Sequence, residues 1–328
     1  MGRSYRGVKA ITVIAVVAAL AVACAQLPAL GAGGLLHPAR RVSAAPTPAS
    51  CRAADFAGAG VTLRGWRCAG SGPSRGTVIY LHGVADNRAS AVGAIQRFTA
   101  RGFDVIAYDS RAHGQSGGDA CTYGFFEKRD LRAVVDTLRP GPVVLIGTSL
   151  GAAVALQEAA DDPRIAAVVA AETFSDLRTV AAERAPFFFT RTSIARALRL
   201  AEEQARFEVN AAAPVAAAPR IRAAVLLIHG ERDVETPPAH SQRVFAALDG
   251  PKRLLLVPGA GHNGSLRGEV WAEIDRWIDA ALGLPKEKDE PGKRELAGNR
   301  IDDVDLAGVE AGRQRAGGDL ELEDRRLP

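Results

Sequence analysis

The order of short apolar runs along the chain restricts the fold more than any other feature of the sequence. Six such runs alternate with longer segments, and four of them are followed within two residues by a glycine. The runs span residues 77–81, 105–108, 143–146, 166–171, 223–228 and 254–257. Continuous apolar strands separated by helices predict a mostly parallel, doubly wound α/β sheet with helices on both faces. Ligands of such sheets bind beyond the carboxyl ends of the strands, so we expect the functional residues directly after these runs.

Residues 174–213 interrupt this alternation. The stretch contains three consecutive phenylalanines, residues 187–189, and has helical spacing of apolar residues over 192–207. The pattern predicts a small helical cap inserted over the site, although a plain crossover helix with a long loop would also produce it.

The beginning of the chain has the pattern of an export signal. Basic residues precede an uncharged apolar run, 10–23, which is shorter than the roughly 20 residues of a membrane span and typical of a signal peptide. Small residues and then Cys24 follow, which fits ordinary cleavage or lipidation of Cys24. We expect residues 1–25 to be a signal peptide or lipoprotein signal, and the protein to be exported, either secreted or held in the cell envelope. Membrane attachment would then run through the N-terminus or through lipidated Cys24.

Composition completes the domain assignment. With 328 residues, 47% of them hydrophobic, the chain can form one large α/β domain with tails or two small domains. Residues 26–50 are rich in Ala, Pro and Gly, which predicts a flexible linker. Residues 286–328 are dense in charge and poor in aromatic residues, which predicts a disordered tail. The folded domain is therefore assigned to residues 51–285.

Charge and motif content exclude several functions. The net charge is +4, but Lys and Arg are scattered among acidic residues and only 5% of the residues are aromatic, whereas a nucleic-acid groove needs a basic stripe. The sequence also has no H-E-x-x-H, paired Cys-x-x-Cys or G-x-x-x-x-G-K-[ST] motif. We expect no nucleic-acid partner, no metal and no cofactor.

The cysteines suggest one disulfide. Export permits disulfides, and Cys51 and Cys68 lie 17 residues apart on either side of a glycine-containing, hairpin-like stretch. We predict that they pair, which leaves Cys121 either buried or paired with a group that the sequence does not reveal.

Ser149 is the candidate nucleophile. It is the centre of a G-x-S-x-G motif, Gly147 to Gly151, that follows an apolar run and precedes an apolar helix. In such a motif the serine sits on a tight strand-to-helix turn, and larger residues at the glycine positions would collide with the adjacent strand and helix. The alternative is a serine that merely caps the helix.

A serine hydroxyl needs a base beside it, and in this arrangement the acid and then the histidine follow the serine along the chain. Among the later histidines, His229 closes an apolar run and His240 begins a helix, whereas His262 lies in a glycine-rich loop after the last run. We predict His262 as the base. Asp233 is the predicted acid, which fixes the histidine tautomer. The less favoured alternatives are Glu231, which is close to the strand end, and Glu172, which follows the fourth run.

The tetrahedral oxyanion requires two backbone donors. We predict the amide of Leu150, directly after the nucleophile, and the amide of Val84, in the loop after the first run. His82, in the same loop, is interpreted as structural.

Five ordered motifs resemble those of a known family. They are IYLHGVADN (79–87), YDSRAHGQSGG (108–118), IGTSLGA (146–152), HGERDVETP (229–237) and PGAGHN (258–263). The chain resembles the α/β-hydrolase superfamily, and within it the serine aminopeptidase-like and Bem46-like hydrolases. The resemblance implies the α/β-hydrolase fold, the triad Ser149, Asp233 and His262, and structural roles for the loop residues Asp109, Arg111, His113 and Gly114. Thr148 departs from the His, Glu or Asp that many esterases carry at this position, which leaves the subfamily open.

These residues favour hydrolysis of a carboxylic ester of a small-molecule acyl substrate, and the phenylalanine-containing cap favours an acyl group over a peptide. Thioesters and amides use the same groups, so an exported peptidase is the alternative. A peptidase would need an acidic site for a free amine, for which the cap offers Glu183, Glu202, Glu203 and Glu208. A catalytically silent binding protein on this fold is the third hypothesis.

Overall fold

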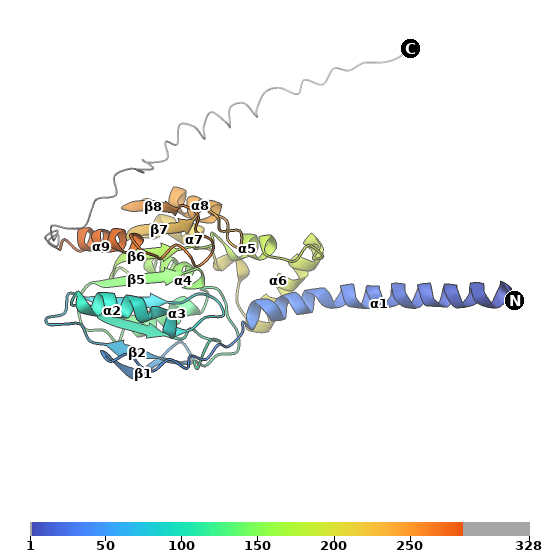
Figure 1. Ribbon diagram of the computed structural model, residues 1–328, viewed down its shortest axis with the longest axis horizontal. Helices are drawn as coiled ribbons and strands as arrows, with labels where there is room; N and C mark the ends of the chain where they lie inside the picture. Colours follow the sequence, from blue (N-terminus) through green and yellow to red (C-terminus); the bar gives the residue numbers. More distant parts are fainter. Residues whose placement is uncertain (1, 285–328) are drawn as a thin grey trace, which may run out of the picture. The chain divides into compact units, whose positions relative to one another are not determined.

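Eight strands form one sheet in the computed structural model, which describes residues 2–284 (Figure 1). The strand order is β1-β2-β4-β3-β5-β6-β7-β8; β1 pairs with β2 and β2 with β4 in antiparallel fashion, and all other neighbours are parallel. The strands are β1 (Cys51–Ala57), β2 (Thr62–Cys68), β3 (Thr77–Leu81), β4 (Asp104–Tyr108), β5 (Val143–Thr148), β6 (Ile165–Ala171), β7 (Ala224–Gly230) and β8 (Lys252–Val257). The six predicted strands are β3 to β8, so the mostly parallel α/β sheet is confirmed.

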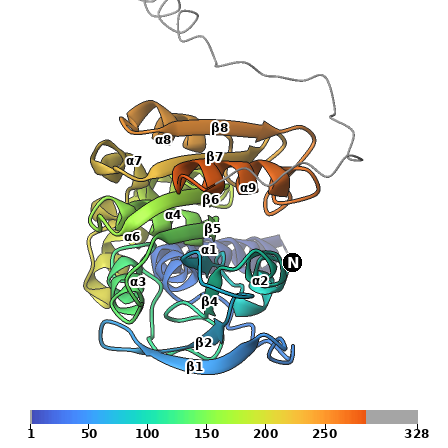
Figure 2. The ribbon, with the colours of Figure 1, turned by 90° about the vertical axis from the view of Figure 1, so that its left-hand side faces the viewer.

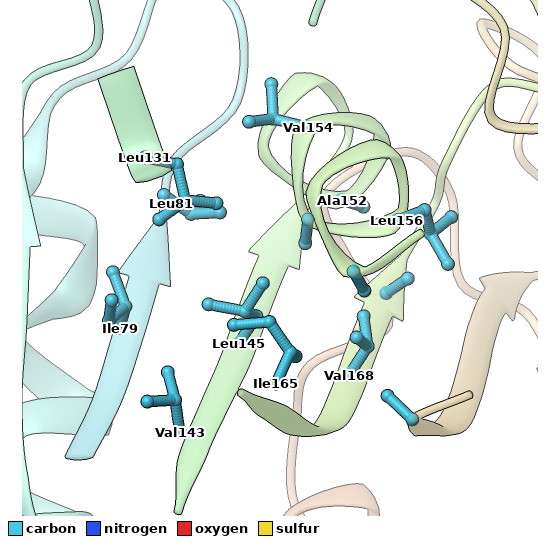
Figure 3. Packing of buried hydrophobic residues seen from close by; sticks show 14 of the residues in the cluster. Ile79, Leu81, Leu131, Val143, Leu145, Ala152, Val154, Leu156, Ile165 and Val168 are labelled. Atoms are coloured by element: carbon cyan, nitrogen blue, oxygen red, sulfur yellow. The ribbon is translucent and has the colours of Figure 1, made fainter. Parts of the chain in front are cut away.

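Helices cover both faces of the sheet because the side chains of a strand alternate between the faces. On one face, Val143 and Leu145 of β5 pack with α3 (Glu127–Val135), α4 (Leu150–Ala159) and α8 (Ala239–Ala247). The other face carries η1 (Arg88–Ala91), α2 (Val92–Ala100) and α9 (Val270–Ala281). Figure 2 shows α2 and α9 on the side of the sheet opposite to α3. Figure 3 shows the first cluster, where Leu145 and Val168 face the α4 residues Ala152 and Leu156.

The segment between β6 and β7 contains the predicted helical insertion. It forms α5 (Leu177–Glu183), α6 (Arg191–Ala205), η2 (Val209–Ala211), α7 (Pro214–Ala217) and η3 (Ala218–Arg220). Asp176 accepts a hydrogen bond from the amide of Thr179 and Thr190 one from the amide of Ser193, so both longer helices begin at side-chain caps.

The prediction of a flexible linker over residues 26–50 is wrong for its first part. Helix α1 (Gly2–Leu36) continues to Leu36. Its residues Pro28, Ala32 and Leu36, spaced by four, are buried, and the last two pack in one cluster with residues of the insertion. Close packing explains this result, because a Cβ atom at Gly31 would lie 3.0 Å from the Cβ of Ala197 in α6. Composition alone indicated flexibility, whereas the small side chains permit the two helices to approach each other.

The residues that follow this helix are tied to the loop after β4. The carbonyl of Leu36 accepts a hydrogen bond from the amide of Cys121 at 2.8 Å, and that of Leu35 accepts one from the Tyr123 hydroxyl at 3.0 Å. Arg40 donates to the carbonyl of Ser116 at 2.7 Å. Residues 27–40 are therefore part of the same folded unit as the sheet. The predicted disordered tail, 286–328, lies outside the described residues.

The predicted disulfide is present. Cys51 and Cys68 face each other across β1 and β2 and are bonded. Cys24 is exposed and Cys121 is buried, and both are free thiols. No helix within residues 2–284 combines the length and the hydropathy that crossing a membrane requires.

Candidate active site

Ser149 stands at the junction of β5 and α4 with a strained backbone, φ 49° and ψ −111°. The two glycines of the motif are sterically required, since a Cβ atom at Gly151 would lie 2.1 Å from the carbonyl oxygen of Leu81, and one at Gly147 only 2.4 Å from the backbone of Gly151. The side chain of Ser149 makes no capping hydrogen bond to α4, so the alternative of a simple helix cap is wrong.

The structure brings together the three side chains that the sequence singled out. The Nε2 atom of His262 lies 3.0 Å from the Oγ atom of Ser149, and its Nδ1 atom lies 2.7 Å from the Oδ2 atom of Asp233. The three residues follow β5, β7 and β8, at the carboxyl ends of parallel strands. Ser149 is only 5% exposed, so its side chain is largely shielded from solvent.

Asp233 is held as an anion. Burial opposes its ionisation, but hydrogen bonds from His229, His262 and the amide of Thr236 outweigh this effect and keep the pKa of the carboxyl well below its usual value. A carboxylate at Nδ1 fixes the proton of His262 on that nitrogen, which leaves Nε2 free to accept the hydroxyl proton of Ser149.

Glu172 has a different role from the acid that the sequence offered as an alternative. It follows β6 directly, has a left-handed backbone with φ 57°, and is buried. Its carboxylate accepts hydrogen bonds from three consecutive amides, those of Asn263, Gly264 and Ser265, at 2.7, 3.1 and 3.0 Å. Glu172 therefore anchors the loop that carries His262. Sequence reasoning missed this function, although the position of a carboxylate directly after a strand was the signal available.

The two predicted oxyanion donors flank the serine. Leu150 is the first residue of α4, and Val84 follows Gly83, where an added Cβ atom would lie 3.6 Å from the Cβ of Ser149. His82 donates from Nδ1 to the carbonyl of Gly83 at 2.7 Å and accepts from the amide of Ser110 at 2.9 Å. Because a trans peptide points its C=O and N–H in opposite directions, this bond also fixes the direction of the Val84 amide.

A second chain of Ser, His and acid lies in the buried region between α5 and α8. His240 accepts at Nδ1 from the amide of Ser175 at 3.0 Å and lies 2.9 Å from its hydroxyl, and its Nε2 donates to Glu183 at 2.7 Å. The side chain of Arg243 also reaches Nδ1, at 2.8 Å. Since Ser175 and His240 are fully buried and lack a strained turn, this chain of hydrogen bonds joins the insertion to α8.

Two of the acidic residues that could have formed an amine site are engaged elsewhere. Glu183 binds His240, and Glu202 accepts from the amide of Val209 at 2.9 Å. Phe187 and Phe188 are 99% and 53% exposed and thus do not line an enclosed acyl pocket. Within residues 2–284, no three His, Cys, Asp or Glu side chains are grouped so that they could hold a metal ion.

Family models match most of the region that contains the site. The model described as alpha/beta hydrolase fold matches residues 76–211, and that described as TAP-like protein matches residues 200–278. The uncharacterized protein YfhR of Escherichia coli (strain K12) is 30% identical over 244 residues, which cover 70% of this chain and 80% of YfhR. The uncharacterized protein YqkD of Bacillus subtilis is 28% identical over 207 residues, and this match covers 57% of this chain and 64% of YqkD.

Solved structures share the fold at lower identity. The Pyrococcus furiosus esterase Pf2001 superposes with a TM-score of 0.60 at 23% identity and covers 75% of this chain and 98% of its own. Acetyl xylan esterase 1 from Thermoanaerobacterium has a TM-score of 0.57 at 18% identity, covering 78% and 93%. The acylaminoacyl peptidase of Pyrococcus horikoshii has a TM-score of 0.57 at 15% identity, covering 74% of this chain and 43% of the peptidase.

Proposed function

The chain belongs to the α/β-hydrolase superfamily, and from this premise we propose that it is a serine hydrolase that cleaves a carboxylic ester through an acyl-enzyme on Ser149. The observation that carries the proposal is the hydrogen-bonded chain from Asp233 through His262 to Ser149 on a strained turn. Strain of this kind persists where the surrounding structure enforces it, and it is concentrated at functional sites.

The geometry supports a two-step reaction. The Oγ atom of Ser149 attacks the ester carbonyl while Nε2 of His262 takes its proton, and the amides of Leu150 and Val84 stabilise the oxyanion. The intermediate then expels the alcohol, which receives the proton from His262, and leaves an acyl group on Ser149. In the second step a water molecule gives a proton to His262 and its oxygen to the acyl carbon. Collapse of this intermediate releases the acid, and the proton returns from His262 to Ser149.

The substrate class is inferred from what surrounds the site. Two of the similar solved structures are esterases and one is a peptidase, and all three use a common fold. A peptidase that recognises a free amine would need unengaged carboxylates near the site. Glu183 and Glu202 already hold hydrogen bonds within the protein, which leaves only the exposed Glu203 and Glu208 for this role. These contacts favour an ester over a peptide.

We also propose that the protein works outside the reducing cytosol. The apolar run at 10–23 supports export, and the Cys51–Cys68 disulfide is of the kind that persists in oxidising compartments.

Labelling with a fluorophosphonate probe tests the nucleophile. The full chain should be labelled and should turn over p-nitrophenyl esters, while Ser149→Ala should lose both properties because the reacting oxygen is gone. The matched control is Ser175→Ala, which removes another buried serine that contacts a histidine and should keep the label. Retention of the label in Ser149→Ala, or its loss only in Ser175→Ala, would contradict the assignment.

A further inference from the structure

The turn between α5 and α6 exposes aromatic side chains to solvent. Among the described residues, the exposed large hydrophobic side chains number seven, and the two aromatic ones, Phe187 and Phe188, are both in this turn. Their rings contact each other with centroids 5.5 Å apart. Burying a phenylalanine side chain stabilises a protein by about 1.5–3 kcal/mol relative to leaving it in water, so an exposed pair indicates a surface that binds a partner. We call Phe187 and Phe188 the cap tip.

The cap tip lies beside the N-terminal helix. The ring of the next residue, Phe189, packs on α1, since a Cβ atom at Gly31 would lie 2.9 Å from it. Figure 1 shows the turn between α5 and α6 next to the last part of α1. Cys24 precedes Gly31 by seven residues of continuous helix, which corresponds to about 10 Å along the axis. Because residues 27–36 are packed rather than flexible, the apolar run at 10–23 leads directly to the cap tip.

The helix after the cap tip is basic. Arg191, Arg196 and Arg199 are exposed, and none of them forms a salt bridge with another residue in the described part of the chain. The charged residues that precede the cap tip are engaged: Arg184 pairs with Glu235, and Glu183 with His240. The acidic residues of α6, Glu202 and Glu203, lie at its other end, so the half of the helix next to the cap tip carries positive charge only.

We propose that the cap tip and the first half of α6 dock on an anionic phospholipid bilayer, with Phe187 and Phe188 entering the boundary between headgroups and acyl chains. Exposed aromatic residues beside unpaired arginines are the combination by which peripheral elements bind such a surface. The proposal is independent of the reaction at Ser149.

A second copy of the chain is the other possible occupant. A stable interface buries about 800 Å² on each partner, whereas two phenylalanines bury at most about 500 Å². The cap tip is too small for such a dimer but large enough to anchor a helix at an interface.

Fluorescence quenching tests insertion of the cap tip. Tryptophan placed by Phe187→Trp in the full chain should be quenched by vesicles of brominated, phosphatidylglycerol-containing lipid. Wild-type protein supplies the background, because its own Trp66, Trp271 and Trp277 are buried or half-buried. Val42→Trp is the matched control at another exposed apolar position and should show no added quenching. Equal quenching of wild type and Phe187→Trp would overturn the proposal.

Charge reversal tests the lipid headgroup. In the Phe187→Trp background, Arg191→Glu with Arg196→Glu should lower the affinity for phosphatidylglycerol-containing vesicles by about fivefold for each arginine lost, which weakens the quenching. Vesicles of phosphatidylcholine alone should bind the Phe187→Trp protein with a similarly reduced affinity. Arg139→Glu with Arg222→Glu makes the same charge change at exposed positions before β5 and β7 and should have no effect. An equal loss of vesicle affinity in both double variants would contradict a site on α6. If the protein forms a dimer that Phe187→Ser with Phe188→Ser dissociates, the cap tip binds a second copy of the chain instead.

Discussion

At the scale of residues, the site depends on one buried carboxylate that touches no reacting atom. Glu172 holds three successive amides of the loop after His262, so it restricts where the imidazole can lie. An amide side chain at this position would keep one acceptor oxygen but would direct an NH₂ group at backbone donors. Glu172 is thus a positioning residue.

Glu172→Gln should therefore slow catalysis more than it weakens substrate binding. We expect kcat to fall by up to about a hundredfold with little change in KM, because small displacements of a catalytic group have effects of this size. The rate of fluorophosphonate labelling should fall in parallel. Glu158→Gln is the matched control: Glu158 is equally buried but pairs with Arg132 in α3. If kcat falls equally in both variants, the decrease comes from a general loss of protein stability and not from the position of His262.

The sequence predicted Ser149, His262 and Asp233 because each follows a strand and occurs in a fixed order along the chain. The same rule placed Glu172 in the right region but could not assign its role, since an acid after a strand can contact either an imidazole or backbone amides. The distinction depends on a contact between residues 91 to 93 positions apart. Such a contact follows from the path of the loop, which the residue pattern does not determine.

At the scale of elements, the edges of the fold were the hardest to predict. The central strands are continuous apolar runs, which the residue pattern identifies directly. The hairpin of β1 and β2 and the end of α1 contain small or polar residues, and their order comes from pairing with distant segments. For this reason, the Ala-, Pro- and Gly-rich composition from residue 26 onward predicted a flexible linker, whereas the structure has a packed helix up to Leu36.

Removing the disulfide should loosen the hairpin. Cys51 and Cys68 enclose a loop of 17 residues, so Cys51→Ser with Cys68→Ser should lower the free energy of unfolding by about 3 kcal/mol. Urea denaturation of the two forms measures the difference. Reducing agent should destabilise the wild type by a similar amount and leave the double variant unaffected. A double variant as stable as the wild type would show that sheet pairing alone holds β1.

Substitution of Gly31 should separate α1 from α6. The new Cβ atom of Gly31→Ala would approach Phe189 and Ala197 to 3.0 Å or less, so residues 27–40 should be cut faster by a protease. Gly33→Ala is the matched control, because nothing lies within 4 Å of its added Cβ atom, and there alanine should stabilise the helix by about 0.5–1 kcal/mol. Equal protection of both variants would contradict close packing at Gly31.

At the scale of the whole molecule, stability depends on buried histidines that must remain neutral. His82 and His113 lie in edge-to-face contact with ring centroids 5.2 Å apart, and both are fully buried. Burial lowers the pKa of His82, and burial together with the neighbouring His82 lowers the pKa of His113 to about 4. Between pH 6.5 and pH 4, His113 is protonated in the unfolded chain but neutral in the folded chain. The neutral, buried His113 therefore contributes fully to the free energy of unfolding above pH 6.5, and this contribution is lost as the pH falls to 4.

The difference in unfolding free energy between wild type and His113→Asn should therefore shrink by about 3 kcal/mol between pH 7.5 and pH 4. The comparison with the variant is needed because other groups act in the opposite direction. Burial of Glu158, for example, raises the pKa of its carboxyl to about 7. Urea denaturation at both pH values gives the two differences. A difference that does not change with pH would show that His113 takes up a proton in the folded protein.

Under the proposed function, the position of His262 after the last strand also means that the three catalytic side chains are complete only when the end of the domain has been synthesised. Ser149 emerges from the ribosome 113 residues earlier, and the loop anchored by Glu172 has no partner until β8 has been added to the sheet. An unfinished chain would therefore carry the proposed nucleophile without its proposed base. A protein made in one compartment and folded in another would thus stay inert until it had arrived.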